Sequence, residues 1–453
     1  MHLKPETAPL KSIVRDWLRP HKRHEYVIFL IKIYSIFRTK NVKAFIRVFS
    51  TSVYVVVNAI WAIPFVLLIR CLRPWRVVRL GGITADVIGH FVLEVSWIGA
   101  LKSEQKRDSL DLFYYFSINS LIGTWGFSRP CNTFYAALTE RNLRILPAFI
   151  LVPISIWNRV MPGGRAHHIP SSWERDHFTQ DVHGWLQRSG AKLPFSIEEN
   201  NQAGDWLRRQ GLQSGDAYCC LLVRDSCFKG EDGFQKESTI RNSDIRDYVD
   251  AVKMLADSGV WVLRMGKKMS ARLELSHPRV IDYAFHSERS DFLDIWLFAH
   301  CDLCISTGCG PDMVSLAYNR PFLCLNYIPL FWFLSSIFAN YAFKKLIWRS
   351  SGSPLRLQEY LDNCFHAGSD YAQQGIDIID LGPNEICAVV EETWQRVQGI
   401  WTDSKESQVR QAEFWRVVKS HPKFNHYHGW IHPQSTVSSV WLASMNEEFF
   451  KML

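Results

Sequence analysis

The stretch 302–326, D-L-C-I-S-T-G-C-G-P-D-M-V-S-L-A-Y-N-R-P-F-L-C-L-N, restricts the possible folds more than any other part of the chain. It indicates a buried strand at Leu303 to Ser306, a loop with two glycines, and a helix that begins at about Pro311. A second short strand follows at Phe322 to Leu325. A strand, a glycine loop and a helix returning to another strand form the repeating unit of a parallel α/β sheet.

The same loop is a candidate binding site for an anion. Glycines before a helix start leave backbone N–H groups aimed at one point, with the positive helix end behind them. Diphosphates bind in this way at the carboxyl ends of parallel strands, although an ordinary strand–helix turn gives a similar pattern. The residues expected around the anion are Ser306, Thr307, Gly308, Gly310 and Asp312.

Upstream segments bring three arginines to the carboxyl edge of the same predicted sheet. Arg224 follows a strand at Tyr218 to Val223, Arg264 ends a strand that begins at Val260, and Arg241 precedes a capped helix. Arginine suits the bidentate grip of phosphate oxygens, while the alternative for each residue is a surface ion pair. The further candidates for this anion-binding site are Asp225, Ser226, Asn242, Ser243, Gly266 and Tyr283.

The cysteine content indicates the cellular compartment of the chain, and the charge distribution indicates its partners. The 453 residues include 11 cysteines, an odd number without regular spacing, which favours reduced cytosolic thiols. Cys301 and Cys304 lack a second ligand pair, so no metal site is expected. The formal charge is +8, and residues 1–50 hold 11 Lys/Arg against 3 Asp/Glu, so the excess belongs to this segment.

The N-terminal region reads as a membrane-associating extension. A basic, partly amphipathic segment over 10–50 precedes Thr51 to Ile69, which has no charged residue but contains Asn58 and Pro64. We expect a helix lying in the interface of an anionic membrane; a true span and a buried soluble helix are the alternatives. Nucleic acid is not expected as a partner. The predicted location is cytoplasmic, at the inner membrane face, and removing 1–70 should then release the chain.

The first globular domain is predicted to begin near Trp75. Arg76 to Leu80 reads as a strand, followed by a glycine turn and a helix on which Asp86 and His90 share one face. The expected divisions are an extension over 1–74, a first Rossmann-like domain over 75–205, a second over 206–425, and a C-terminal helix over 426–453.

Several blocks of the sequence resemble those of a bacterial family of glycosyltransferases. These blocks are V-R-D-S at 223–226, R-N-S-D-I-R-D-Y at 241–248, V-L-R-M-G at 262–266, I-D-Y-A at 281–284 and R-S-D-F-L-D-I at 289–295. The turn A-D-V-I-G-H and the glycine loop are more remotely similar to those of heptosyltransferases. The resemblance implies a GT-B arrangement of two facing Rossmann-like domains, in which the C-terminal helix over 426–453 returns to the first domain. Pro311-Asp312 departs from that pattern, so the donor's identity does not carry over.

The resemblance implies sugar transfer from a nucleotide-sugar donor to a glycan or lipid-linked acceptor, in bacterial surface polysaccharide synthesis. No Asp-x-Asp occurs, and 308–321 contains no glutamate, which favours an inverting, metal-independent reaction without a cofactor. Asp86 is the expected base, with His90 orienting the acceptor or a phosphate; the reverse assignment is the alternative. Another polysaccharide-modifying transferase, such as a pyruvyl transferase, and a non-catalytic membrane-attached scaffold are the competing interpretations.

Overall fold

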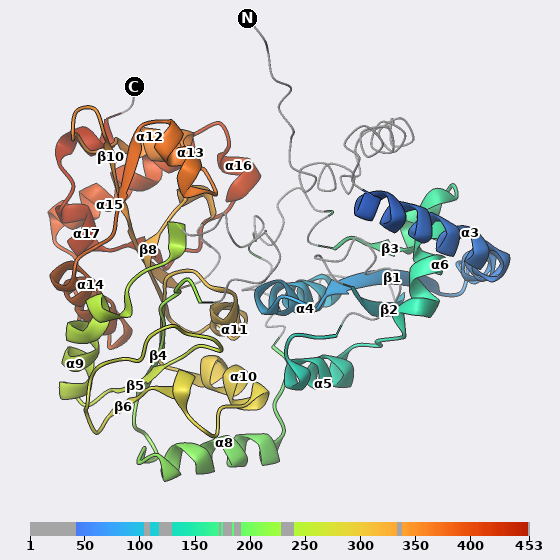
Figure 1. Cartoon of the computed structure of the whole chain (residues 1–453), viewed down its shortest axis with the longest axis horizontal. Coiled ribbons are helices and arrows are strands. Elements are labelled where there is room, and N and C mark those ends of the chain that lie inside the picture. The colour runs from blue at the N-terminus through green and yellow to red at the C-terminus, as the bar shows by residue number, and fades with distance from the viewer. Residues whose placement is uncertain are drawn as a thin grey trace, which may run out of the picture. The chain divides into compact units, whose positions relative to one another are not determined.

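The computed structural model describes residues 42–103, 109–116, 129–171, 174, 184, 192–227, 240–332 and 338–451. The chain forms two compact units, residues 1–179 and 180–453. Each unit is built on a parallel sheet with helices (Figure 1), so the predicted α/β class is confirmed. The basic segment before residue 42 lies outside the described residues.

The first unit contains a three-stranded parallel sheet in the order β2-β1-β3. Helix α4 packs on this sheet, where Phe91 is fully buried and meets the ring of Tyr135 edge-on at 4.9 Å. The elements of this unit are α3 (Val42–Cys71), β1 (Val77–Thr84), α4 (Ile88–Ser103), β2 (Ser109–Phe116), α5 (Thr133–Asn142), α6 (Ala148–Val160), the 3-10 turn η2 (Gly164–His167) and β3 (His168–Ile169).

The glycine pair at 81–82, predicted as a turn, lies inside strand β1 instead. A Cβ atom at Gly81 would lie 2.9 Å from the ring of Phe113, and one at Gly82 would lie 2.9 Å from the ring of Phe116. The two glycines therefore leave room for large aromatic side chains on β2, which is a known reason for glycine within a strand.

Helix α3 is part of the first unit rather than a separate extension. Its residues Ala62, Val66 and Ile69 form a buried cluster with Val78 and Leu80 of β1 and with Leu151 and Ile154 of α6. These three α3 positions follow helical spacing, so one side of the helix lies in the core. The predicted division at residue 74 therefore cuts through this core.

The second unit holds a seven-stranded sheet in the order β12-β9-β8-β7-β4-β5-β6, and all six pairings are parallel. Helices α9 and α14 cover one face, and α10 and α11 cover the other (Figure 1). Its strands are β4 (Tyr218–Leu222), β5 (Trp261–Arg264), β6 (Val280–Ile281), β7 (Leu303–Ser306), β8 (Phe322–Tyr327), β9 (Ala339–Phe343) and β12 (Ser435–Val437). A separate antiparallel pair joins β10 (Lys345–Trp348) to β11 (Ile376–Ile379).

The helices of the second unit begin at recognisable caps. Ser290 accepts a hydrogen bond from Leu293 N–H at the start of α10, and Ser196 with Glu199 forms a capping box on α8. The helices are α8 (Ile197–Arg209), α9 (Val249–Asp257), α10 (Asp291–His300), α11 (Met313–Ala317), α12 (Leu357–Asp362), α13 (Gly368–Gln373), α14 (Pro383–Val397), α15 (Lys405–Ser420), α16 (Phe424–Tyr427) and α17 (Ser439–Ala443). The 3-10 turns are η4 (Ile245–Tyr248), η5 (Tyr283–Phe285), η6 (Gly310–Asp312), η7 (Leu330–Trp332) and η8 (Glu447–Phe450).

Two segments differ from the predicted domain limits. Helix α8, which the predicted division at 205 cuts, packs as a whole in the second unit, where Asn200 accepts a hydrogen bond from Trp296 and Trp206 is buried against Tyr283. The C-terminal segment, expected as a helix on the first domain, adds strand β12 beside β9. Trp441 of α17 donates a hydrogen bond to Phe343 O, so this segment completes the sheet of the second unit.

Candidate functional site

The glycine loop lies where the strand order of the large sheet reverses. From β4 the chain continues to β5 and β6 on one side, and then crosses to β7 on the other side of β4. Leu222 is level with Ser306, so β4 and β7 end side by side. Arg224 N–H donates to Thr307 Oγ1 at 3.0 Å, which ties the two loops together just past the strands. Ligands of open α/β sheets bind at such a reversal point.

Two of the three predicted arginines meet at this edge. Arg241 donates through Nη1 to Gly308 O at 3.0 Å. Burial and the neighbouring charge of Arg241 lower the pKa of Arg224, while Cys309, Asp312 and Tyr327 raise it. Two like charges held together at a half-buried position favour the binding of an anion between them.

The backbone N–H groups of the loop are largely engaged within the loop itself. Gly308 N–H donates to Ser306 Oγ at 3.1 Å, and Cys309 N–H donates to Asp312 Oδ2 at 2.7 Å. Ser306 Oγ–H also donates to Asp312 Oδ2 at 2.6 Å, and Thr307 N–H donates to Leu222 O. The predicted cradle of free N–H groups is therefore reduced, and arginine side chains supply the charge at this edge.

Gly308 is fixed by its neighbours rather than by space for a ligand. Its φ is +78°, in the left-handed region that favours glycine. A Cβ atom at this position would overlap the ring of Tyr327, a buried side chain at the end of β8. Burial raises the pKa of Tyr327, so the phenol stays protonated beside the loop. No local pattern indicates this contact, because β8 reads as a plain apolar strand.

Asp312 is the acidic group below the loop and is fully buried. Burial raises its pKa to about 6, against the hydrogen bonds from Ser306 and Cys309 and the charge of Arg241. Its Oδ1 is buried without a hydrogen-bond partner among the described residues. Gly310 and Asp312 bound the 3-10 turn η6, so the predicted helix start at Pro311 is confirmed.

The block 241–248 is anchored by a polar cluster beneath it. Ser243 Oγ–H donates to Asp380 Oδ2 at 2.9 Å and accepts from Asn326 Nδ2 at 3.0 Å. Lys344, only 3% exposed, donates to Asn242 O at 2.7 Å and pairs with Asp380 at 2.6 Å. Asn242 and Ser243 therefore position Arg241 from below. Asn326, Lys344 and Asp380 come from distant segments and could not be associated with this block from sequence spacing.

The other predicted donor-site residues lie along β5 and β6 and have structural partners. Arg264 is 1% exposed and holds Asp282 at 3.2 Å and Ala271 O at 2.9 Å, so its guanidinium is turned into the protein. Tyr283 is fully buried, and its hydroxyl lies 3.2 Å from Ser290 N. The sequence correctly placed Arg264 at a strand end but did not reveal its ion pair with Asp282.

The loop after β4 contains Asp225 and Ser226, and the loop after β5 contains Gly266. Asp225 Oδ2 accepts hydrogen bonds from Ser270 N–H at 2.6 Å and from Ser270 Oγ–H at 2.7 Å, which ties the loop after β4 to the loop after β5. Ser226 is exposed. A Cβ atom at Gly266 would lie 2.5 Å from Met269 Sδ, so Gly266 serves the packing of that second loop.

The predicted catalytic pair lies in the first unit, at the turn from β1 to α4. Asp86 precedes the helix and His90 is in its first turn. Ala85, next to Asp86, donates to Phe116 O at 3.3 Å and accepts from Cys131 N–H at 2.8 Å, so the turn is held by two other segments. The turn is a defined position for both side chains, and their roles stay predictions.

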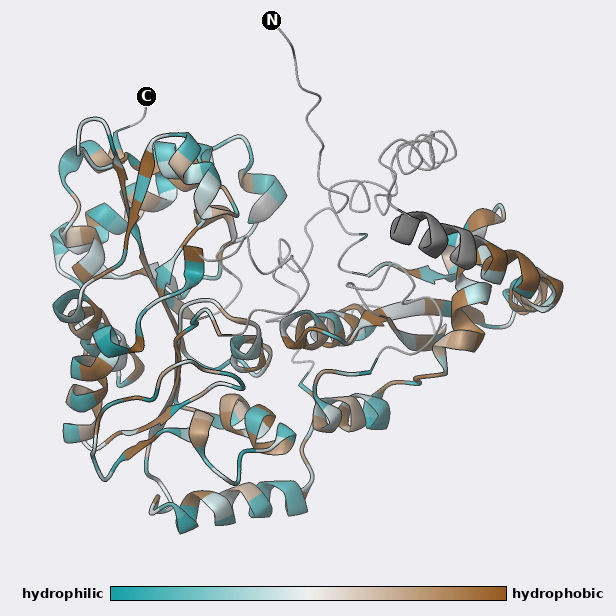
Figure 2. Cartoon of the chain, viewed as in Figure 1, coloured by the Kyte–Doolittle hydropathy of each residue, from teal (hydrophilic) through white to brown (hydrophobic). Residues whose placement is uncertain are grey.

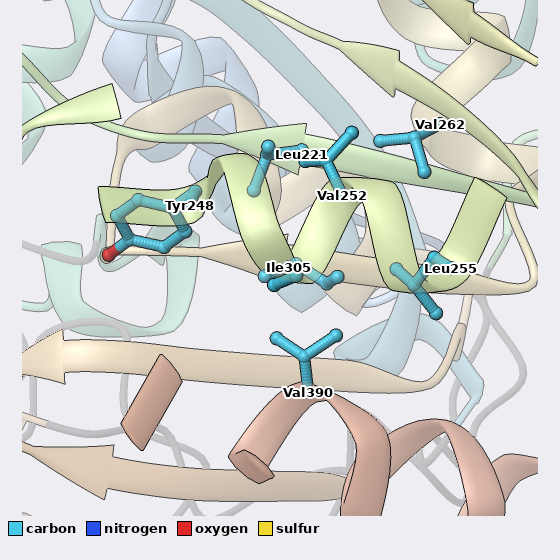
Figure 3. A pocket seen from close by; sticks show the side chains of 8 residues that line it. Leu221, Tyr248, Val252, Leu255, Val262, Ile305 and Val390 are labelled. Carbon is cyan, nitrogen blue, oxygen red and sulfur yellow. The ribbon is translucent and has the colours of Figure 1, made fainter. Parts of the chain in front are cut away.

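One small apolar gap and the arrangement of metal-binding side chains in the described part of the chain do not offer a second site. A small gap between the sheet and helices α9 and α14 is apolar (Figure 3); its lining is Leu221, Tyr248, Ala251, Val252, Leu255, Val262, Ile305 and Val390. Among the described residues, no three His, Cys, Asp or Glu side chains are placed to hold a metal ion.

Solved structures similar to this chain are glycosyltransferases. A glycosyl transferase family 9 protein from Veillonella parvula aligns at 12% identity and a TM-score of 0.38, covering 59% of this chain and 86% of that one. The E. coli ADP-heptose LPS heptosyltransferase II aligns at 13% identity and a TM-score of 0.32, covering 55% and 84%. The E. coli heptosyltransferase WaaC with ADP aligns at 12% identity and a TM-score of 0.28, covering 54% and 86%.

The remote similarity to heptosyltransferases expected from the sequence is thus found among solved structures. No protein-family model and no curated protein matches the chain. Identities and TM-scores this low assign no donor, acceptor or reaction to it.

Proposed function

We propose that this chain is a glycosyltransferase that binds a nucleotide-sugar donor at the carboxyl edge of the large sheet, with the diphosphate on Arg224 and Arg241. One observation supports this most: two arginines from separate segments are bound to the glycine loop where the strand order reverses, Arg224 through its backbone N–H and Arg241 through its guanidinium. Asp312, the nearby acid, is buried and accepts a hydrogen bond from Ser306 of the loop.

The proposed reaction is an inverting displacement. Asp86 removes the proton from an acceptor hydroxyl, whose oxygen attacks the anomeric carbon as the bond to the diphosphate breaks. Arg224 and Arg241 stabilise the negative charge on the departing nucleoside diphosphate. His90 orients the acceptor or a phosphate. The acceptor is a glycan or a lipid-linked glycan, and the reaction uses no metal ion.

The test is a binding screen of the full chain against a panel of nucleotide sugars, read by thermal shift and then by calorimetry. Arg224→Gln and Arg241→Gln should each lower the affinity for the selected donor about 10- to 100-fold, because each removes a charge-assisted hydrogen bond worth about 1.5–3 kcal/mol. Arg349→Gln is the control, since Arg349 forms an exposed ion pair with Asp377. Full affinity in both loop variants, or loss of affinity on adding a chelator, would contradict this placement.

A further inference from the structure

Helix α3 has an outer side that is as apolar as its buried side. From Val53 to Cys71 it is long and apolar enough to cross a membrane by length and composition. Val53, Val56, Val57 and Ile60 follow the spacing of one helix face, and Ile60 is 84% exposed. A helix on the surface of a water-soluble domain carries polar residues on its outer face. Figure 2 shows α3 hydrophobic along its length beyond Val53.

Helix α6, about ninety residues further along the chain, extends this apolar surface. Tyr54 Oη–H donates to Phe149 O at 3.0 Å, and Trp157 Nε1–H donates to Val55 O at 3.0 Å, so the two helices are joined side by side. Phe149 is 54% exposed and Ile150 is 38% exposed. We call Val53, Val56, Val57, Ile60, Phe149 and Ile150 the α3–α6 surface.

The charged residues within the two segments that form this surface are all basic. No aspartate or glutamate occurs from residue 26 to 85 or from 141 to 173. Arg73 and Arg76 are exposed just after α3, and Arg165 is exposed just after α6. Trp75 between the first two is 81% exposed, and tryptophan is enriched at membrane interfaces. An apolar surface with cationic side chains beyond the C-terminal ends of both helices fits the headgroup region of an anionic lipid bilayer.

We propose that the α3–α6 surface is a monotopic membrane-docking site, in which both helices insert their outer side chains into one leaflet. A span by α3 is incompatible with its packing, because Ala62, Val66 and Ile69 lie against the strand residues Val78 and Leu80. Carrying α3 through the bilayer would bring an open sheet into hydrocarbon, where its edges would lack partners. This proposal is independent of the sugar-transfer proposal.

The test uses the full chain and sucrose-loaded vesicles of phosphatidylcholine with about 30% phosphatidylglycerol. Sedimentation is measured at low salt and at about 0.5 M NaCl, where the charge contribution is screened and the apolar contribution remains. The wild-type chain should stay bound in high salt. Ile60→Glu and Phe149→Glu should each lower its partition onto vesicles about tenfold or more. Ile400→Glu, at a 66% exposed position of the second unit, should bind like the wild type.

Circular dichroism and thermal unfolding of each variant show that it is folded. Three results would overturn the proposal. Wild-type binding of vesicles by Phe149→Glu would show that α6 does not contribute to the docking surface. Both variants could remain on the vesicles and resist extraction by alkaline carbonate, which indicates a span. Both variants could bind vesicles normally but be monomers in analytical ultracentrifugation where the wild type is a dimer. This result would show that the α3–α6 surface binds a second copy of the chain instead of a membrane.

Discussion

Single residues at the glycine loop show that the role of a sequence motif depends on residues that contact it from other segments. Gly308 has a φ of +78° and its missing Cβ leaves room for the ring of Tyr327. We therefore expect Gly308→Ala to lower the free energy of unfolding even without a ligand. Gly352→Ala is the matched control, because Gly352 has a φ of +69° and nothing within 4 Å of its missing Cβ.

Gly352→Ala should cost only the backbone strain of about 1–2 kcal/mol. Gly308→Ala adds an overlap with a buried ring, for which about 1–3 kcal/mol more is expected. Chemical denaturation of both variants measures the difference. Equal losses would show that Tyr327 moves aside freely and that Gly308 is instead available for close approach by a ligand.

Asp312 gives the loop a dependence on pH. Its pKa rises from 3.8 in the unfolded chain to about 6 in the folded one, mainly through burial. The folded state therefore binds the proton more tightly, and the stability from this group is complete below about pH 4 and lost as the pH rises to about 6. One pKa unit corresponds to about 1.4 kcal/mol, so ionising Asp312 costs about 3 kcal/mol.

Asp312→Asn should abolish this step. Denaturation curves of the wild-type chain and the variant, measured from pH 4 to 7, should diverge across that interval, with the wild type losing more stability. Asp294, whose pKa burial also raises to about 6, remains in both chains and does not affect the comparison. Parallel curves would show that Asp312 is not the titrating group.

Residue chemistry in the sequence predicted the site in part. Arg224 and Arg241 lie at the expected edge because strand ends can be read from apolar runs and caps. Arg264 likewise ends an apolar strand, yet it is buried and paired with the half-buried carboxylate of Asp282. That pairing depends on how the loop after β5 folds back, which local spacing does not encode. Tyr283 is buried for the same reason.

At the scale of elements, the packing of α3 decides what a truncation would do. Removing residues 1–70 deletes Ala62, Val66 and Ile69 and exposes Val78, Leu80, Leu151 and Ile154. Loss of the three side chains from a core of this kind costs several kcal/mol. We expect this truncated chain to aggregate or to lose the cooperative unfolding of its first unit, as measured by calorimetry.

The sequence analysis predicted that removing residues 1–70 would release the chain from the membrane. Misfolding of the truncated chain would mask that release. The single substitution Ile60→Glu is the better probe because Ile60 contributes little to the core. A truncated chain that stays soluble, unfolds cooperatively and sediments away from membranes would show instead that α3 is a dispensable extension.

Elements with strong local signals were predicted to the residue. Strand β7 spans Leu303–Ser306, as its apolar run indicated, and strand β4 begins at the predicted Tyr218. Strand β1 was cut short in the prediction because Gly81 and Gly82 read as a turn. Their function is to accommodate Phe113 and Phe116 from β2, and a neighbouring strand's side chains are not visible in a local pattern.

At the scale of the whole molecule, the proposed chemistry is divided between the two units. The donor arginines belong to the second unit, and the predicted base belongs to the first. With the donor found by the binding screen, Asp86→Asn should lower turnover about 10²-fold or more at unchanged donor affinity, as for a lost general base. His90→Ala should have a smaller effect and should change the KM for the acceptor.

Turnover is measured by release of the nucleoside diphosphate, with thermal unfolding as the check of folding. Normal turnover by Asp86→Asn together with an inactive His90→Ala would reverse the two roles. Normal turnover by both would move the base to another part of the chain.

The hydrogen bonds within the glycine loop have a consequence for how a donor would be recognised. Ser306 already accepts a hydrogen bond from Gly308 N–H, and Asp312 accepts one from Cys309 N–H and one from Ser306 Oγ–H. The loop therefore has its shape without a bound ligand. Such a preorganised receptor avoids the entropy penalty of ordering a chain segment during association. Donor capture would then proceed as a single fast encounter steered by two cations, with the residence time governed by how firmly the rest of the sugar nucleotide is held.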